Sequence, residues 1–256
     1  MDYKTFAIDL AYKAGEIMRK NFSLGMRKEW KENNTPLTIS DTLINKIVIE
    51  SVKKQFPGHA VVGEEESFLQ VSDYVWLCDP IDGTIPFSHG IPVSTFSLAL
   101  AHKGVPIFGV VYDPYMDRLF VGEKDKGAYL NNKLINVSSK STLKNAVLNV
   151  EGKSISEQSA FVKNELLKKG VKIVSLASFA YCGVLVAAGE FSASIFFPDN
   201  PWDVAAVKVI VEEAGGKCTD LQGNDQYYDK KTNGFIASNG PVHAELVELI
   251  KQSINT

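Results

Sequence analysis

The sequence predicts an α/β protein with α+β character, in which an antiparallel N-terminal sheet is followed by a smaller, mixed C-terminal sheet. Residues 95–101 alternate with period two, and short apolar runs continue to residue 130, which indicates an antiparallel meander. From about residue 143 strand-like and helix-like segments alternate, as they do in α/β units. We therefore predict an N-terminal α+β subdomain at residues 1–142 and a C-terminal α/β subdomain at residues 143–256.

Two amphipathic helices precede the meander. The first carries apolar residues at helical spacing over residues 6–22, and the second runs from near Ser40 to Pro57. Thr38 and Asp41 fit a capping pattern, in which a hydroxyl residue is followed three positions later by an acid. The pattern predicts that the second helix begins just after Thr38.

The C-terminal half predicts further helices between short strands. Ser156 is expected to cap a helix through Lys169, and Asp203 is expected in the first turn of a helix that runs to Gly215-Gly216. Strands are expected at residues 146–150, 171–175 and 191–197. No linker, repeat or low-complexity tract separates the two halves, so we expect them to be tightly fused, with a site at their junction.

Composition excludes several classes of protein. The chain has 256 residues, of which 45% are hydrophobic and 22% charged, as is ordinary for a globular protein. A net charge of −3 gives no electrostatic case for binding nucleic acid or an anionic membrane, and no apolar run approaches the ~20 residues that span a bilayer. The first residues lack the layout of a signal peptide, and the three cysteines are scattered, so we expect a cytoplasmic protein.

Two carboxylates follow the apolar run at residues 74–77, which is typical of a buried strand. Asp79 and Asp82 stand three residues apart, Pro80 between them has no N–H to donate, and Gly83 permits a tight turn. Two such carboxylates ~4 Å apart repel by about 4 kcal/mol at an effective dielectric constant of 20. Mg²⁺ would relieve that repulsion and also bind phosphate. The alternative is a turn whose acids only cap backbone groups.

Further acidic motifs stand elsewhere in the chain. Residues 38–41 open a helix with an aspartate, residues 62–66 place three glutamates after an apolar run, and residues 200–203 place an aspartate after Pro-Trp. Together with residues 78–84, these blocks resemble, in their order and near their spacing, those of the inositol monophosphatase family, the lithium-sensitive, magnesium-dependent phosphatases. The resemblance covers nearly the whole chain, including residues 108–114.

The family resemblance implies a layered α-β-α-β-α sandwich of the sugar phosphatase type, with a site for two or three Mg²⁺ ions. One ion is expected to bind Glu64, Asp79 and the backbone carbonyl of Ile81. A second is expected to bind Asp79, Asp82 and Asp203, so that Asp79 bridges the two, and a weaker third ion is expected near Glu64. One ligand, Asp203, would thus come from the C-terminal half.

The resemblance also implies how the phosphate ester is attacked. Asp41 is expected to pair with Thr84 and activate a metal-bound water, with Glu64 in the same catalytic set. Backbone N–H groups of Gly83 and Thr84 are expected to hold phosphate oxygens. Glu65 is expected to support the metal ligands from behind.

The expected substrate is a small phosphorylated metabolite of the inositol monophosphate type, contacted by Asp82, Phe179 and Phe196. In inositol-specific members of the family a glutamate stands where this chain has Phe196, a small residue where it has Phe179, and often Asn or Asp where it has Cys182. These differences favour two alternatives, 3′-phosphoadenosine 5′-phosphate or histidinol phosphate, whose rings the phenylalanines would face. The competing interpretation is that both phenylalanines belong to the core.

The remaining expectations concern two residues, the oligomeric state and other functions. In the family a lysine near Lys31 can lie close to the phosphate, but we interpret Lys31 as an ordinary surface lysine and His89 as a rim residue. Homodimerisation is a family expectation. Signatures of serine hydrolases, Rossmann dehydrogenases and P-loop proteins do not occur. A regulator that binds the transcription machinery is the alternative of another class.

Overall fold

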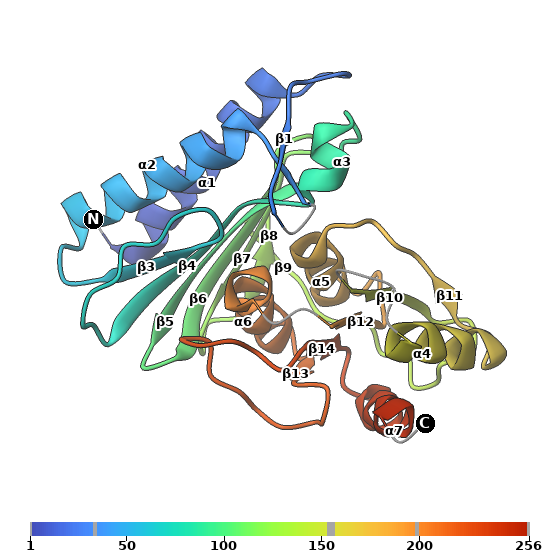
Figure 1. Ribbon diagram of the computed structural model, residues 1–256. Coiled ribbons are helices and arrows are strands. Elements are labelled where there is room, and N and C mark those ends of the chain that lie inside the picture. The colour runs from blue at the N-terminus through green and yellow to red at the C-terminus, as the bar shows by residue number, and fades with distance from the viewer. Residues whose placement is uncertain (1, 33–34, 153–156, 198–199, 255–256) are drawn as a thin grey trace.

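The computed structural model describes residues 2–32, 35–152, 157–197 and 200–254, and its helices and sheets stack in alternating layers (Figure 1). The first layer holds two helices, on the outer face of a seven-stranded sheet, and a middle layer of two helices separates this sheet from a five-stranded one. The last layer covers the far face of the smaller sheet. In this order the three pairs are α1 (Tyr3–Asn21) with α2 (Ile39–Gln55), α5 (Phe179–Ala187) with α6 (Ala205–Glu213), and α4 (Glu157–Lys168) with α7 (His243–Ile254).

The larger sheet has the strand order β3-β4-β5-β6-β7-β8-β9. β3 pairs with β4 in parallel, and every later pair is antiparallel. The prediction of a wholly antiparallel N-terminal sheet is therefore wrong at this edge, because the connection over residues 64–73 returns the chain to the same end of the sheet. The strands are β3 (Ala60–Gly63), β4 (Tyr74–Asp82), β5 (Thr95–His102), β6 (Val105–Asp113), β7 (Arg118–Glu123), β8 (Ala128–Leu130) and β9 (Lys133–Leu134).

The smaller sheet has the order β11-β10-β12-β14-β13 and is mixed, as predicted. β10 runs parallel to both of its neighbours, whereas β14 is antiparallel to both of its own. The strands are β10 (Val147–Glu151), β11 (Lys172–Ile173), β12 (Ala193–Phe196), β13 (Lys217–Thr219) and β14 (Phe235–Ser238). One apolar cluster joins Leu77 and Val111 of the large sheet to Phe235 of the small one through α5 and α6. The two halves therefore share a core, and the division between residues 142 and 143 stays a proposal.

Helix α6 lies very close to the large sheet, because two glycines face it. Gly109 on β6 and Gly122 on β7 are directly paired across the sheet. A Cβ atom at Gly109 would stand 2.6 Å from the carbonyl oxygen of Ala206, and one at Gly122 would stand 2.8 Å from Cα of Ile210. Both distances are far below ordinary contact, so only glycine permits this approach.

Smaller elements differ from the sequence predictions in detail. Asp203 ends a 3₁₀ turn, η1 (Pro201–Asp203), and α6 begins only at Ala205, so the expectation that Asp203 lies in the first turn of α6 is wrong. Val204, at φ −130°, separates the two elements. The predicted cap Ser156 lies outside the described residues. No helix of the described chain is long and apolar enough to cross a membrane.

Candidate active site

The end of β4 carries the two acids that the sequence identified. Asp79 and Asp82 are buried, at 3% and 2% exposure, and the pairing of β4 with β5 shifts register between them. Asp79 Oδ1 accepts the N–H of Ile81 at 3.0 Å. Burial raises the pKa of Asp79 well above its ordinary value, and neighbouring charges add to the shift: those of Glu64, Asp82, Asp203 and Asp41. Such a concentration of buried carboxylates favours the binding of a cation.

Asp82 is held by the C-terminal half of the chain. Its Oδ1 accepts the N–H of Phe179 at 2.6 Å, and its Oδ2 accepts the N–H of Tyr181 at 3.2 Å and the hydroxyl of Ser178. Thr95 on β5 adds a hydroxyl donor at 3.2 Å. Burial raises the pKa of Asp82 to about 6, although these donors oppose the shift. The start of α5 and the end of β4 are therefore joined through one carboxylate.

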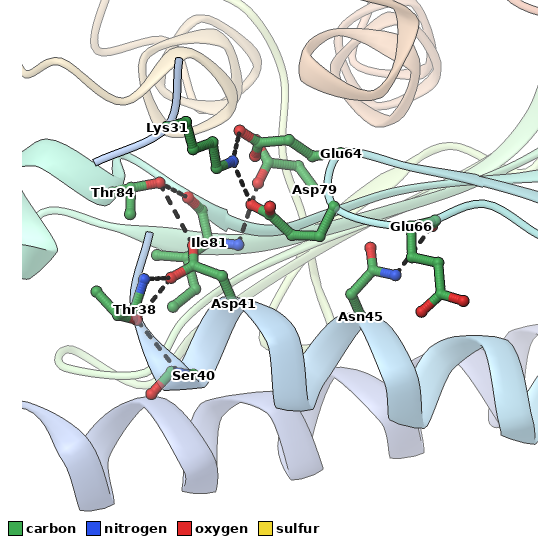
Figure 2. Close-up of polar contacts among 11 residues, drawn as sticks. Lys31, Thr38, Ser40, Asp41, Asn45, Glu64, Glu66, Asp79, Ile81 and Thr84 are labelled. Carbon is green, nitrogen blue, oxygen red and sulfur yellow. Dashed lines mark hydrogen bonds and ion pairs between the residues drawn. The ribbon is translucent and has the colours of Figure 1, made fainter. Parts of the chain in front are cut away.

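Glu64 and Glu65 follow β3 and share a lysine, Lys31, whose contact with Glu64 is drawn in Figure 2. Lys31 Nζ lies 3.0 Å from Glu64 Oε1 and 2.5 Å from Glu65 Oε1, and its side chain is only 19% exposed. Burial disfavours the charge of Lys31, but the two glutamates still raise its pKa. The interpretation of Lys31 as an ordinary surface lysine is therefore wrong. Lys31 directly follows β1 (Glu29–Trp30), which pairs with β2 (Pro36–Leu37) in a hairpin. This hairpin brings Lys31 to the two glutamates.

Asp41 and Thr84 meet beneath the end of β4 (Figure 2). Thr38 caps α2, and its N–H and hydroxyl donate to Asp41 Oδ2 at 2.8 and 2.5 Å, which confirms the predicted capping box. The hydroxyl of Thr84, the first residue of α3 (Thr84–Ser88), lies 3.5 Å from Asp41 Oδ1 and 3.0 Å from the carbonyl oxygen of Ile81. Burial raises the pKa of Asp41 to about 7, although the Thr38 donors oppose this.

A cavity of about 330 Å³ brings most of the predicted site residues together: Glu64, Asp79, Ile81, Asp82, Gly83, Thr84, Phe179 and Asp203. Asp203 Oδ2 accepts a hydrogen bond from Asn200 at 3.3 Å. Asp41 is wholly buried behind Thr84 and does not line the cavity. A larger cavity of about 480 Å³ beside Lys208 contains none of the predicted residues, so it is not the candidate active site.

The two phenylalanines have different places. Phe179 lines the cavity, whereas Phe196 is wholly buried behind it, with the ring centroids 5.0 Å apart and the rings edge to face. Phe196 also stacks on Phe235 at 6.2 Å. Phe196 therefore belongs to the core, so the prediction that it contacts the substrate is wrong, whereas Phe179 can touch a ligand. Neither sequence interpretation holds for both residues, because each treated the two phenylalanines alike. His89 is exposed at the end of α3 and does not line the cavity.

Comparison with known proteins identifies the family. A model of the inositol monophosphatase family matches residues 2–255. The chain belongs to the inositol monophosphatase family. It is 34% identical to an inositol monophosphatase of Mesembryanthemum crystallinum, over 98% of this chain and 97% of that one. A Thermotoga maritima fructose-1,6-bisphosphatase/inositol-1-monophosphatase is 32% identical over 99% and 98%.

A solved structure and a third relative agree with this membership. A Thermotoga maritima IMPase superposes with a TM-score of 0.91 at 32% identity, covering 100% of this chain and 99% of that chain. A Neisseria meningitidis relative named putative Nus factor SuhB is 31% identical, over 97% of each chain. The protein is therefore a phosphomonoesterase of the inositol monophosphatase family, whose members are metal-dependent phosphatases.

The donor set of the cavity fits a hard divalent ion. Carboxylates and a backbone carbonyl are the ligands that Mg²⁺ prefers, and burial leaves their charges poorly compensated. Within the described ranges no three Asp, Glu, His or Cys side chains are already grouped closely enough to hold an ion. In the structure Asp82 accepts hydrogen bonds from the start of α5, and Glu64 is paired with Lys31.

Sequence reasoning missed several residues of this family site. Ser178, whose hydroxyl donates to Asp82, precedes α5 at the position that favours a hydroxyl residue, so its local pattern was available. Glu151 and Lys163 also line the cavity, and no local motif marks either of them. Their places follow only from the packing of β10 and α4.

Proposed function

We propose that the protein hydrolyses the phosphate monoester of a small metabolite, of the inositol monophosphate type, at a site for two Mg²⁺ ions with a weaker third ion near Glu64. One observation carries the proposal: Glu64, Asp79, Asp82 and Asp203 come from three separate segments and line a single cavity. Glu64, Asp79 and the Ile81 carbonyl would hold one ion, and the three aspartates the other. Bound there, Mg²⁺ lowers the pKa of a water molecule and stabilises the leaving oxygen.

The Thr84–Asp41 pair would direct the attacking water. Asp41 Oδ2 is fixed by Thr38, so Oδ1 remains for the Thr84 hydroxyl at 3.5 Å. When the Thr84 proton points to Asp41, the Thr84 oxygen accepts a hydrogen bond from the water and turns a lone pair of that water toward phosphorus. Backbone N–H groups of Gly83 and Thr84 would hold phosphate oxygens. Glu65 supports Glu64 through Lys31, since both carboxylates contact the same ammonium group.

The leaving alcohol would lie against Phe179, which is the aromatic residue among the described cavity-lining residues. The aromatic wall also suits the adenosine and imidazole rings of 3′-phosphoadenosine 5′-phosphate and histidinol phosphate, which we keep as alternatives. Phosphate release from these two esters, inositol 1-phosphate and fructose 1,6-bisphosphate ranks the candidates directly.

Removing Asp203 tests the proposed function. Asp203→Asn should leave the fold intact and lower Mg²⁺-dependent kcat/KM by at least about 100-fold, because one charged ligand of the metal pair is lost. Asp73→Asn is the matched control, since the Asp73 side chain is 64% exposed and forms a surface ion pair with Lys103. Full Mg²⁺-dependent turnover in Asp203→Asn would refute the assignment.

The relative named putative Nus factor supports a second candidate function, binding to the transcription machinery. Co-purification with RNA polymerase, with and without Mg²⁺, tests it; retention by the inactive Asp203→Asn protein would separate this role from catalysis. We also propose that the protein is a homodimer, which sedimentation of the purified protein tests, and that it is cytoplasmic, which cell fractionation tests.

A further inference from the structure

Asn45 is a polar residue on the buried face of α2, one helical turn after Asp41. The two residues are 2% and 0% exposed, and residues one turn apart lie on the same side of a helix. Asp41 meets Thr84, whereas Asn45 reaches the connection between β3 and β4. There its Nδ2 donates to the backbone carbonyl oxygen of Glu66 at 2.9 Å (Figure 2). α2 therefore contacts the region of the active site at two points.

The segment that Asn45 contacts is the one that carries Glu64 and Glu65. The N–H of Glu64 donates to the carbonyl oxygen of Cys78 on β4 at 3.1 Å, which ties the start of this segment to the large sheet. Two residues further on, the amide of Asn45 ties the carbonyl group of Glu66 to α2. The backbone of both glutamates therefore lies between two fixed points, and the direction of their side chains depends on both contacts.

Gly63, the last residue of β3, allows α2 to come this close. A Cβ atom there would stand 2.4 Å from Asn45 Oδ1 and 2.5 Å from the carbonyl oxygen of Glu66, so a larger residue would displace the segment that follows. Asn45 Oδ1 is buried and has no hydrogen-bond partner among the residues that the structure describes. Because an unpaired buried acceptor destabilises a fold, packing alone would favour an apolar side chain of similar size at this position.

We propose that Asn45 is a positioning residue, which holds the segment after β3 so that Glu64 faces the proposed Mg²⁺ site. Two methylene groups separate the carboxylate of a glutamate from its backbone, so a backbone that shifts spreads the carboxylate over many positions. Fixing that backbone in advance lowers the conformational entropy that is lost when the carboxylate binds an ion. The inference rests on the proposed function, because it requires that Glu64 binds Mg²⁺.

Calorimetry of Mg²⁺ binding without substrate tests the proposal on two leucine variants. Asn45→Leu nearly keeps the volume of the side chain and removes the amide, so the Kd for Mg²⁺ should rise by about 2- to 10-fold, the effect of one neutral hydrogen bond. Asn239→Leu is the matched control. Asn239 is also 2% exposed, its Nδ2 donates to Ser138 Oγ and to the carbonyl oxygen of Lys140 at 3.0 and 2.8 Å, and its Oδ1 likewise has no partner over the described ranges. Asn239 does not line the cavity, so its loss should change the Kd by less than about twofold.

Turnover of p-nitrophenyl phosphate gives a second readout, which general damage to the fold would move differently. If Asn45 acts only by positioning Glu64, excess Mg²⁺ restores the occupied site by mass action, so kcat of Asn45→Leu at saturating Mg²⁺ should lie within about twofold of the native value. General damage would lower kcat at every Mg²⁺ concentration. Asn45→Ser, whose shorter side chain does not reach the carbonyl group of Glu66, repeats both measurements if leucine prevents folding.

The outcomes separate this inference from the proposed function. If the native protein neither binds Mg²⁺ nor releases phosphate from p-nitrophenyl phosphate, the proposed function itself fails. If the native protein binds Mg²⁺ and the Asn45 variants bind it within about twofold as tightly, the positioning role is overturned while the proposed function stands. An equal loss of Mg²⁺ affinity in Asn239→Leu would also overturn it, because the cause would then be general destabilisation.

Discussion

The close packing of α6 against Gly109 and Gly122 of the large sheet yields a prediction that links packing to the active site. In Gly109→Ala, the new Cβ would stand 2.6 Å from the backbone oxygen of Ala206, 0.8 Å short of the 3.4 Å at which ordinary contact begins. The obstacle is helix backbone, so α6 itself has to move. Overpacking of this kind costs about 1–3 kcal/mol. For a chain of 256 residues, a loss of about 2 kcal/mol lowers Tm by about 4–8 °C.

The same displacement should also shift Asp203, one of the proposed metal ligands. α6 begins two residues after Asp203, so the helix carries that carboxylate with it. We expect Gly109→Ala to raise the Mg²⁺ concentration needed for half-maximal activity. Thermal unfolding and Mg²⁺ titration of Gly109→Ala are compared with Gly58→Ala, because a Cβ at Gly58 meets no atom within 4 Å. If Gly109→Ala melts within roughly 1 °C of the native protein, about the precision of the assay, the close approach of α6 to Gly109 does not contribute to stability.

Two further predictions concern groups away from the cavity. Tyr181→Phe removes a hydroxyl that donates to Asp113 Oδ2 at 2.9 Å, so urea unfolding should show a loss of about 1–3 kcal/mol. An unchanged unfolding midpoint would contradict this. Burial lowers the pKa of His243 to about 4 from 6.5, so its contribution is complete above pH 6.5 and is lost as pH falls toward 4, by up to about 3 kcal/mol. His243→Asn should therefore lose less stability than the native protein between pH 7 and pH 4.5, and equal losses would exclude His243 as the cause.

Residues whose partners lie close by in the sequence could be predicted from it, and residues with distant partners could not. Asp79 and Asp82 stood out because a strand, a proline and a glycine surround them within one short stretch, and the capping box at Asp41 is complete within four residues. Lys31 was misjudged because its two glutamate partners lie 33 and 34 residues further along the chain. No local pattern reports a contact that depends on how a hairpin folds back over a sheet.

The division between Phe179 and Phe196 has a similar cause. Both are large apolar residues, Phe179 at the start of a helix and Phe196 at the end of a strand, and composition alone cannot tell a cavity wall from a core. Their separation follows from the edge-to-face contact and from the stacking of Phe196 on Phe235, a residue of another strand. Parallel pairing of β3 with β4 was likewise missed, since strand direction depends on where a connection returns.

By itself the sequence determined the chemistry available to this protein: hard oxygen donors at a strand end, a hydroxyl and an acid at a helix start, and the family to which they belong. Local periodicity and capping carry that information, because they depend on neighbours within a few residues. Only the tertiary structure decided which of those groups meet. It placed Lys31 among the glutamates, Asp82 at the start of α5 and Glu151 on the cavity wall, because contacts between distant segments are set by the packing of whole layers against one another.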